Sequence, residues 1–276
     1  MRGPALAFPE WLSLREPADA AARATDLVEE VRRSLTSGDR VVVHDLGCGA
    51  GSMARWLAPR LPGPQHWVMY DRDDDLLTLA AGHPPAEAAD GAPVTLETRR
   101  RDITRLGGDE LAGASLVTAS ALLDMFTGEE LDRFVALCAA AGCPSLIALT
   151  VTGQVELSPR DPLDDVVAGA FNVHQRRATR TGRRLGPDAA GAAVDAFTAR
   201  GMDVLVRASP WRLGPERANL VAEWFLGWVA AAREQQPELA GELASYTGHR
   251  LAEAAAGRLS VTVHHEDLLA RLSGDR

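Results

Sequence analysis

The stretch VVVHDLGCGAGS, residues 41–52, decides the fold of this chain. Its β-branched beginning fits a strand that is buried on both faces. The glycines Gly47, Gly49 and Gly51 let the backbone turn sharply and approach a bound ligand without interference from a Cβ atom. A helix is expected directly after the turn, and its first N–H groups are unpaired. The stretch therefore predicts a strand, a glycine loop and a helix, which together indicate a nucleotide-type site.

A second strand with an acidic end accompanies the glycine loop. Residues 66–71 are predicted to form this strand, which ends in Asp71, twenty positions after Gly51. An acid at this place is positioned to accept hydrogen bonds from ribose hydroxyls. The dinucleotide fingerprint G-x-G-x-x-G would need its third glycine at position 52, where this chain has Ser52. The pattern therefore speaks against a dinucleotide.

Strands and helices alternate along the rest of the chain. One amphipathic helix is expected at the N-terminus over residues 17–37. Further strands are expected over 94–98, 115–119, 145–151, 202–207 and 259–264. This alternation predicts an α/β fold with a mostly parallel sheet that helices cover on both faces.

The domain organisation follows from length and from two long connections. A chain of 276 residues without internal repeats or low-complexity linkers fits a single domain, 1–276. The connections 152–185 and 214–257 exceed ordinary loops and are expected to be helical insertions that act as lids or substrate walls. An N-terminal helical cap at 1–37 and a cofactor-binding core at 38–151 complete the prediction.

Composition narrows the partners and the compartment. All 29 basic side chains are arginine, 38 are acidic, and the net charge of −9 argues against sequence-independent binding of nucleic acid. Three cysteines without a CxxC pair indicate a reducing compartment, so a cytoplasmic protein is expected. The N-terminal apolar run is too short for a signal peptide. Residues 134–155 are uncharged, but Gly142 and Pro144 interrupt them, so no membrane span is predicted.

Asp45 and the three glycines resemble the first motif of class I S-adenosylmethionine-dependent methyltransferases, an acid, one residue and then G-x-G-x-G. The resemblance covers about residues 40–150, with a looser match over the last strands. It implies a Rossmann-like sheet of seven strands with the last strand antiparallel, and S-adenosyl-L-methionine as the cofactor. It also implies an enzyme that transfers a methyl group to a small-molecule acceptor by in-line displacement.

The same resemblance implies roles for individual residues. The glycine loop would pass under the methionine moiety, Asp71 would hold the ribose, and Arg72 would lie against the adenine. Asp102 would bind the adenine amino group, and Ile103 would pack against the ring. Ser120 begins the segment that would lie beside the methyl group.

Each of these acids also has a plain structural interpretation. Asp71 could cap the next helix, Asp102 could pair with a neighbouring arginine, and Asp45 could orient the loop without touching a ligand. Arg15 is either a charge-assisted fork for the methionine carboxylate or a surface arginine. The segment 120–124 lacks the Asn/Asp-Pro-Pro-Tyr motif, which argues against a nucleobase amine or a glutamine amide as acceptor.

Candidates for catalysis come from the segments that would hold the acceptor. His174 is a candidate general base, and Asp124 could orient the acceptor after the fourth strand. The arginines of the first insertion could bind an anionic acceptor, or form a solvated face that offsets the nearby acids Asp161, Asp164 and Asp165. Adjacent His264 and His265 would point to opposite faces of a strand, so no metal site is predicted.

Other functions remain open beside methyl transfer to an anionic or hydroxyl-bearing small molecule. One is an NAD(P)-dependent oxidoreductase on a similar sheet, although Ser52 speaks against it. Another is a non-catalytic S-adenosylmethionine-binding module that works through a partner. A third is an RNA methyltransferase whose groove is the arginine-rich stretch 176–184, although the acidic composition disfavours nucleic acid. Nothing in the sequence decides the oligomeric state.

Overall fold

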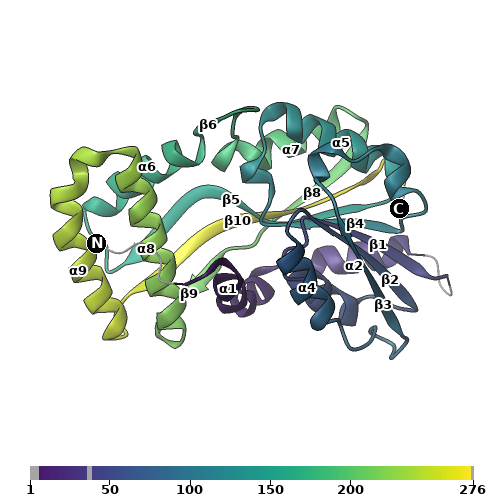
Figure 1. Cartoon of the computed structure of the whole chain (residues 1–276), viewed down its shortest axis with the longest axis horizontal. Coiled ribbons are helices and arrows are strands. Elements are labelled where there is room, and N and C mark those ends of the chain that lie inside the picture. The colour runs from purple at the N-terminus through teal and green to yellow at the C-terminus, as the bar shows by residue number, and fades with distance from the viewer. Residues whose placement is uncertain (1–5, 36–38, 275–276) are drawn as a thin grey trace.

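A mixed sheet forms the centre of the computed structural model, which describes residues 6–35 and 39–274 (Figure 1). In this part of the chain the strand order is β3-β2-β1-β4-β5-β10-β8, and β9 pairs with β10 as an eighth strand. The pairings among β1 to β5 are parallel, whereas β10 is antiparallel to its neighbours. The strands are β1 (Val41–Leu46), β2 (Gln65–Asp71), β3 (Val94–Arg100), β4 (Leu116–Ser120), β5 (Ser145–Ser158), β8 (Met202–Ala208), β9 (Trp211–Leu213) and β10 (Ser260–Leu272).

The predicted α/β fold, with its mostly parallel sheet and antiparallel last strand, is confirmed. The expected number of seven strands is wrong, because β9 adds an eighth strand beside β10. β9 spans three residues directly after Pro210, which is too short to produce a readable alternation. The last strand begins at Ser260, close to the expected start, but it continues to Leu272 instead of ending at 264.

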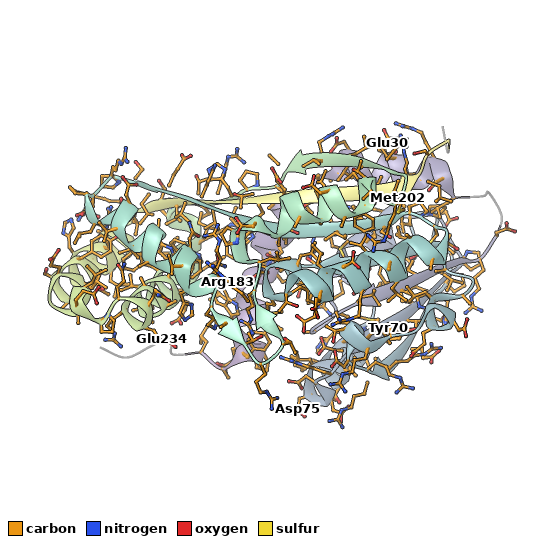
Figure 2. The ribbon with its side chains drawn as sticks, turned by 90° about the horizontal axis from the view of Figure 1, so that it is seen from above. Glu30, Tyr70, Asp75, Arg183, Met202 and Glu234 are labelled. Carbon is orange, nitrogen blue, oxygen red and sulfur yellow. The ribbon has the colours of Figure 1, made fainter. Side chains whose placement is uncertain are left out.

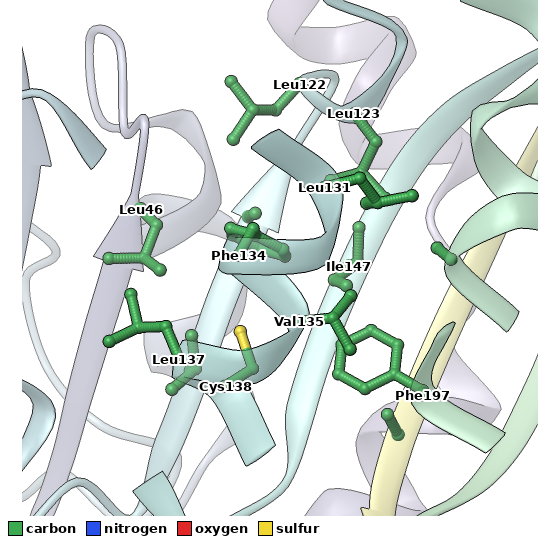
Figure 3. Close-up of a cluster of buried hydrophobic side chains, with 14 of the residues drawn as sticks. Leu46, Leu122, Leu123, Leu131, Phe134, Val135, Leu137, Cys138, Ile147 and Phe197 are labelled. Carbon is green, nitrogen blue, oxygen red and sulfur yellow. The ribbon is translucent and has the colours of Figure 1, made fainter. Parts of the chain in front are cut away.

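Helices cover both faces of the sheet, and each face buries an apolar cluster. On one face, α5 (Gly128–Ala141) and α7 (Ala189–Thr198) pack on a cluster that includes Phe134 and Phe197 (Figure 3). On the other face, α3 (Ser52–Leu57) and α4 (Asp74–Gly82) pack around the fully buried Trp67. Each such side chain contributes about 1.5–3 kcal/mol when it is fully buried. The burial of these two apolar clusters therefore holds the helices on both faces of the sheet.

Two helices replace the single N-terminal helix expected over 17–37. They are α1 (Phe8–Ala22) and α2 (Thr25–Ser34). Pro17 lies inside α1 and does not begin it. The chain breaks before α2, where the carboxylate of the distant Asp267 accepts a hydrogen bond from Ala24 N–H at 2.8 Å. A contact across the molecule fixes this break, so the local pattern did not show it. The cap boundary expected at residue 37 lies outside the described residues.

β5 and β10 continue beyond the core of the sheet and carry a helical subdomain (Figure 1). The subdomain consists of α6 (Leu163–Gln175), α8 (Ala218–Gln235), α9 (Ala240–Ala255) and β9. Side chains from both expected insertions, 152–185 and 214–257, share its apolar cluster, which also includes Ala18 of α1. A short hairpin follows α6 and is formed by β6 (Ala178–Thr179) and β7 (Gly182–Arg183).

The uncharged stretch 134–155 forms the end of α5, a turn and the start of β5, as expected. Gly142 adopts a φ of 68° directly after α5, a conformation that ends helices and favours glycine. Within the described ranges, the helices are all too short or too polar to cross a membrane.

Candidate functional site

The glycine loop lies at the carboxyl ends of β1 and β2, where backbone bonds fix it. The N–H groups of Gly47 and Cys48 both donate to the carbonyl oxygen of Tyr70, at 2.8 and 2.9 Å. Gly47, Gly49 and Gly51 have φ angles of 71°, 53° and 86°. This left-handed region costs other residues about 1–2 kcal/mol each. The backbone of the loop therefore requires the alternating glycines.

Asp71 closes the loop from the end of β2. Its Oδ2 accepts a hydrogen bond from Gly49 N–H at 2.9 Å, and its Oδ1 accepts one from Asp73 N–H at 3.1 Å. The following helix is capped by Asp73, whose Oδ1 accepts bonds from the N–H groups of Asp75 and Leu76. Asp71 therefore holds the loop rather than the helix, and its role toward a ribose stays a prediction.

Replacing Gly51 with alanine is expected to destabilise the protein by two effects. A Cβ atom there would lie 3.1 Å from Met69 Cε and 3.2 Å from Ala80 Cβ, in addition to the strain of the positive φ. Gly113→Ala is the matched control, because Gly113 has a φ of 78° with nothing within 4 Å of its Cβ position. Urea denaturation should show that G113A lowers the free energy of unfolding by about 1–2 kcal/mol. G51A should lower it by about 1–3 kcal/mol more than G113A does. Equal losses would contradict the crowding at Gly51.

Asp45 is buried beneath the loop with one carboxylate oxygen unpaired. The residue is 1% exposed, and the hydroxyl of Thr118 donates to its Oδ1 at 2.7 Å. Its Oδ2 has no hydrogen-bond partner among the described residues. Burial raises the pKa of Asp45, to about 6 in all; the charge of Asp71 acts in the same direction, whereas Thr118 and the guanidinium of Arg23 act in the opposite direction. Its expected role in the site stays a prediction.

The buried carboxyl of Asp45 predicts a pH-dependent stability. Because its folded-state pKa of about 6 exceeds the ordinary value of 3.8, the folded protein holds this proton more tightly. The stabilising contribution is complete below about pH 4 and is lost by about pH 6, a total of about 3 kcal/mol. Urea denaturation measures the free energy of unfolding at each pH. Between pH 4 and pH 7, this free energy should fall by about 3 kcal/mol more for the wild type than for Asp45→Asn. Asp109→Asn, at an exposed acid, is the control. Parallel curves for wild type and D45N would refute the assignment.

Asp102, the acid expected at the adenine, lies in the exposed turn after β3. Its Oδ1 accepts bonds from the N–H and the hydroxyl of Thr104, at 3.1 and 2.7 Å, and these bonds hold the pKa of Asp102 below its usual value. Arg105 Nε lies 3.4 Å from its Oδ2. Asp102 therefore pairs with an arginine, as its structural interpretation allowed. The partner is Arg105, which follows Asp102 in the chain, and not one of the arginines 99–101 that precede it. Adenine binding stays a prediction.

Two apolar side chains flank the glycine loop. A Cβ atom on Gly47 would lie 3.6 Å from Ile103 Cδ1 and 3.1 Å from Leu122 Cδ1. Ile103 was predicted against the adenine ring, and Leu122 belongs to the segment after the fourth strand that was predicted to lie beside the methyl group. Arg72 is exposed directly after Asp71, on the side where Asp102 also lies. The predicted residues from β1, β2 and β3 thus gather at one edge of the sheet.

Arg23 is a buried residue of this site that the sequence did not reveal. It is 3% exposed, and its Nη2 donates to the hydroxyls of Ser52 and Ser120, both at 3.1 Å. Its Nε has no partner among the described residues. Burial lowers the pKa of Arg23, although nearby carboxylates act in the opposite direction. Ser120 lies at the end of β4 as predicted, where Arg23 joins it to the start of α3.

Arg15 lies in α1 and forms a fork on Asp19. Its Nε is 3.0 Å from Oδ2 and its Nη2 is 3.1 Å from Oδ1. Asp19 Oδ1 also accepts a bond from Trp211 Nε1 at 3.0 Å, and the guanidinium of Arg15 lies 4.9 Å from a ring centroid of Trp211. The Arg15 side chain is 16% exposed, so it is no freely solvated arginine. Its role toward a carboxylate of the cofactor stays a prediction.

Asp124 lies in the turn after β4, where three arginines act on its carboxylate. Burial raises the pKa of Asp124, and the charges of Arg15, Arg184 and Arg177 act in the opposite direction. Arg177 and Arg184 flank the β6–β7 hairpin, and Arg184 N–H donates to the Arg177 carbonyl at 3.3 Å. The structure therefore brings the predicted Asp124 together with arginines of the first insertion.

His174 lies at the end of α6, and both of its ring nitrogens have partners. Arg177 Nη1 lies 3.2 Å from Nδ1, and Glu234 Oε2 lies 3.2 Å from Nε2. A guanidinium can only donate hydrogen bonds, so Nδ1 of His174 accepts one from Arg177. Nε2 therefore carries the ring proton and donates a hydrogen bond to Glu234. His174 is thus linked to the Asp124 side of the site through Arg177. Its catalytic role stays a prediction.

The adjacent histidines of β10 point to opposite faces. His264 Nε2 lies 3.0 Å from Glu156 Oε1, whereas the buried His265 ring lies 5.5 Å from the Trp211 ring. Burial lowers the pKa of His265 to about 3, so its ring is neutral at physiological pH. In the described part of the chain, no three His, Cys, Asp or Glu side chains are arranged to hold a metal ion.

Comparisons with known proteins bear on the fold. No family model and no curated protein matches the sequence. A protein from Anaeromyxobacter dehalogenans assigned as a type II methyltransferase has a similar structure, with a TM-score of 0.54, 18% identity and coverage of 90% of this chain and 96% of that one. The cyclopropane synthase MmaA2 from Mycobacterium tuberculosis gives a TM-score of 0.49, 12% identity and coverage of 96% and 95%.

The strand order and the antiparallel β10 define a Rossmann-like α/β protein with the methyltransferase fold. The Anaeromyxobacter dehalogenans protein is a particular example that shares this fold over most of both chains. The glycine loop occupies the place where strand order reverses between β1 and β4. Ligands of open α/β sheets bind outside the carboxyl ends of the strands at such a switch point.

Proposed function

We propose that this protein is an S-adenosylmethionine-dependent methyltransferase that acts on a small molecule. One observation carries the proposal: Asp71 and the glycine loop form a hydrogen-bonded unit at the switch point of the sheet. The fold supports it, as does Ser52 at the position where a dinucleotide fingerprint needs glycine.

The residues present fit the cofactor. Gly47, Gly49 and Gly51 give the loop its left-handed backbone at the ends of β1 and β2, and the unpaired Oδ2 of Asp45 is an acceptor that lacks a donor. Asp71 would hold the ribose hydroxyls. When bound, the cofactor would supply an electrophilic methyl group for in-line transfer to the acceptor, with the sulfur as the leaving group.

Further residues would complete the cofactor site. Asp102 and Arg72 would contact the adenine, with Ile103 against the ring. Arg15 would bind the methionine carboxylate from α1, on the side of the sheet where Arg23 already bonds Ser120. A guanidinium is suited to this task because it binds a carboxylate through two parallel hydrogen bonds.

Asp124 is the candidate for handling a proton of the acceptor. Burial raises the pKa of Asp124, which makes its carboxylate a stronger base. His174, the other predicted catalytic residue, would act through Arg177, because its Nδ1 is already bonded there. The insertions 152–185 and 214–257 would close the site against water, which strengthens the electrostatic interactions inside it.

A cytoplasmic location forms part of the proposal. The cysteines Cys48, Cys138 and Cys143 are unpaired and buried, which suits a reducing compartment.

Calorimetric titration with S-adenosylhomocysteine and with NADH tests the cofactor. We expect S-adenosylhomocysteine to bind and NADH to give no heat, and the reverse result would support an oxidoreductase instead. Transfer of labelled methyl groups to a small-molecule extract from the producing cells then tests catalysis. Cofactor binding without transfer to any extract would favour a non-catalytic module. Transfer to the RNA fraction alone would favour an RNA methyltransferase.

A further inference from the structure

The β6–β7 hairpin is fixed against the segment that follows β4. Arg184 forms an isolated antiparallel bridge with Thr127, and Leu185 N–H donates to the Phe126 carbonyl at 2.8 Å. A Cβ atom on Gly182 would lie 3.4 Å from Thr127 Cγ2, so the hairpin also packs closely there. Figure 2 shows the hairpin from above, marked by Arg183. These contacts hold the arginines that flank the hairpin beside the turn that carries Asp124.

Two arginines at the base of this hairpin have no acidic partner of their own. In the described part of the chain, Arg177 and Arg184 take part in no ion pair, whereas Arg176 between α6 and the hairpin bonds both oxygens of Asp188 at 2.6 Å. Arg184 is half-buried, and its Nε is buried without a hydrogen-bond partner. A buried donor without a partner costs free energy unless a ligand or water satisfies it.

The acids of the first insertion do not neutralise these arginines. Asp164 binds Arg250 through both oxygens at 2.7 Å, Asp165 binds Arg160 at 2.6 Å, and Asp161 accepts from a backbone N–H. These acids therefore make their ion pairs and hydrogen bonds with partners other than Arg177 and Arg184.

The charges of Arg177 and Arg184 act on Asp124, and Glu130 also acts on Arg184, whereas Arg15 already has Asp19 as its partner. Arg72 adds a further positive charge near Arg184. The acceptor side is positively charged in a protein whose net charge is −9. This local excess is what a bound anion would balance.

We propose that the methyl acceptor carries an anionic group, a carboxylate or a phosphate, which Arg184 and Arg177 bind beside Asp124. The inference rests on the proposed methyltransferase function and names the substrate class of the same site. Guanidinium groups suit both anions because their N–H fork matches paired oxygens.

The test uses Arg184→Gln and Arg177→Gln, with Arg180→Gln as the matched control. Arg180 lies in the exposed turn of the same hairpin, so R180Q removes the same charge away from Asp124. The small-molecule extract is separated on an anion exchanger, and each fraction is incubated with protein and methyl-labelled S-adenosylmethionine. Ligand-observed NMR on protein saturated with S-adenosylhomocysteine measures binding of the retained fraction independently of turnover.

We expect labelled product and an NMR binding signal from the retained fraction. R184Q and R177Q should raise the KM for the purified acceptor by about 10- to 100-fold, the loss typical of a charged hydrogen bond. R180Q should stay within about twofold of wild type, and all three variants should keep the wild-type affinity for S-adenosylhomocysteine. Phosphatase treatment of the retained fraction before the reaction separates the sources: lost product indicates a phosphate, and retained product a carboxylate.

Two results would overturn the inference while leaving the cofactor site intact. The first is a protein that binds S-adenosylhomocysteine but labels only the unretained fraction. A protein that binds S-adenosylhomocysteine but gives neither labelled product nor an NMR signal with the retained fraction counts as the same result. The other is a KM for R184Q and R177Q equal to that of R180Q. Failure of the wild type to bind S-adenosylhomocysteine is a different outcome, because it overturns the proposed function itself.

Discussion

The variant Asp71→Ala is expected to bind S-adenosylhomocysteine at least about 100-fold more weakly than the wild type. The substitution removes the acceptor of the Gly49 N–H bond that shapes the loop, and it removes the carboxylate proposed to hold the ribose. Hydrogen bonds to charged groups contribute about 1.5–3 kcal/mol each, and 1.4 kcal/mol corresponds to a tenfold change in Kd. Two such losses therefore exceed a hundredfold change. Calorimetric titration measures the effect directly.

Asp75→Ala is the control for this prediction. Asp75 is an exposed acid in the first turn of α4 (Figure 2), so its loss removes the same charge a few residues away without touching the loop. Its affinity for S-adenosylhomocysteine should match that of the wild type. A Kd for D71A within a few-fold of that of D75A would remove Asp71 from the cofactor site. The free energy of unfolding of both variants shows whether the fold itself is intact.

Replacing Arg250 with alanine is expected to destabilise the helical subdomain by about 3–5 kcal/mol. Arg250 is 1% exposed and donates to both oxygens of Asp164 at 2.7 Å, to Glu253 at 2.9 Å and to the Pro159 carbonyl at 2.7 Å. Its removal leaves the buried carboxylates of Asp164 and Glu253 without their cation. The loss is large because a buried charge without a partner is poorly solvated.

Urea denaturation and amide hydrogen exchange measure this effect. Amide exchange should become faster in α6, α8 and α9, whose apolar side chains share one buried cluster, before it becomes faster in the strands of the core. Arg160→Ala is the matched control, because Arg160 also pairs with an acid of α6, Asp165, but both side chains are more than 70% exposed. An exposed pair contributes at most about 1 kcal/mol, so R160A should stay close to wild type. Equal destabilisation by both variants would contradict the role of burial.

Local sequence patterns predicted the parts of this protein that neighbouring residues decide. The glycine loop was readable because a strand, three glycines and a helix follow one another within twelve positions. The place of Asp71 was readable for the same reason, since parallel strands bring their carboxyl ends to one edge of the sheet. Ile103 was expected beside Asp102 from the resemblance to methyltransferases, and it lies against the loop, three positions after the end of β3.

The residues that the sequence missed depend on contacts between distant segments. Arg23 reaches Ser120 across 97 positions, and Arg250 reaches Asp164 across 86. The pattern also misjudged the N-terminal helix, because the break before α2 is held by Asp267 from β10. A single sequence records no distances between such segments.

The sequence by itself thus determined the class of fold, the glycine loop and the acid at its edge, because each follows from short-range geometry and periodicity. The tertiary structure decided which charges act on one another: Arg177 and Arg184 act on Asp124, whereas Asp164 binds Arg250. The physical reason is that electrostatic and packing interactions depend on separation in space, and only the folded chain sets that separation for residues far apart in sequence.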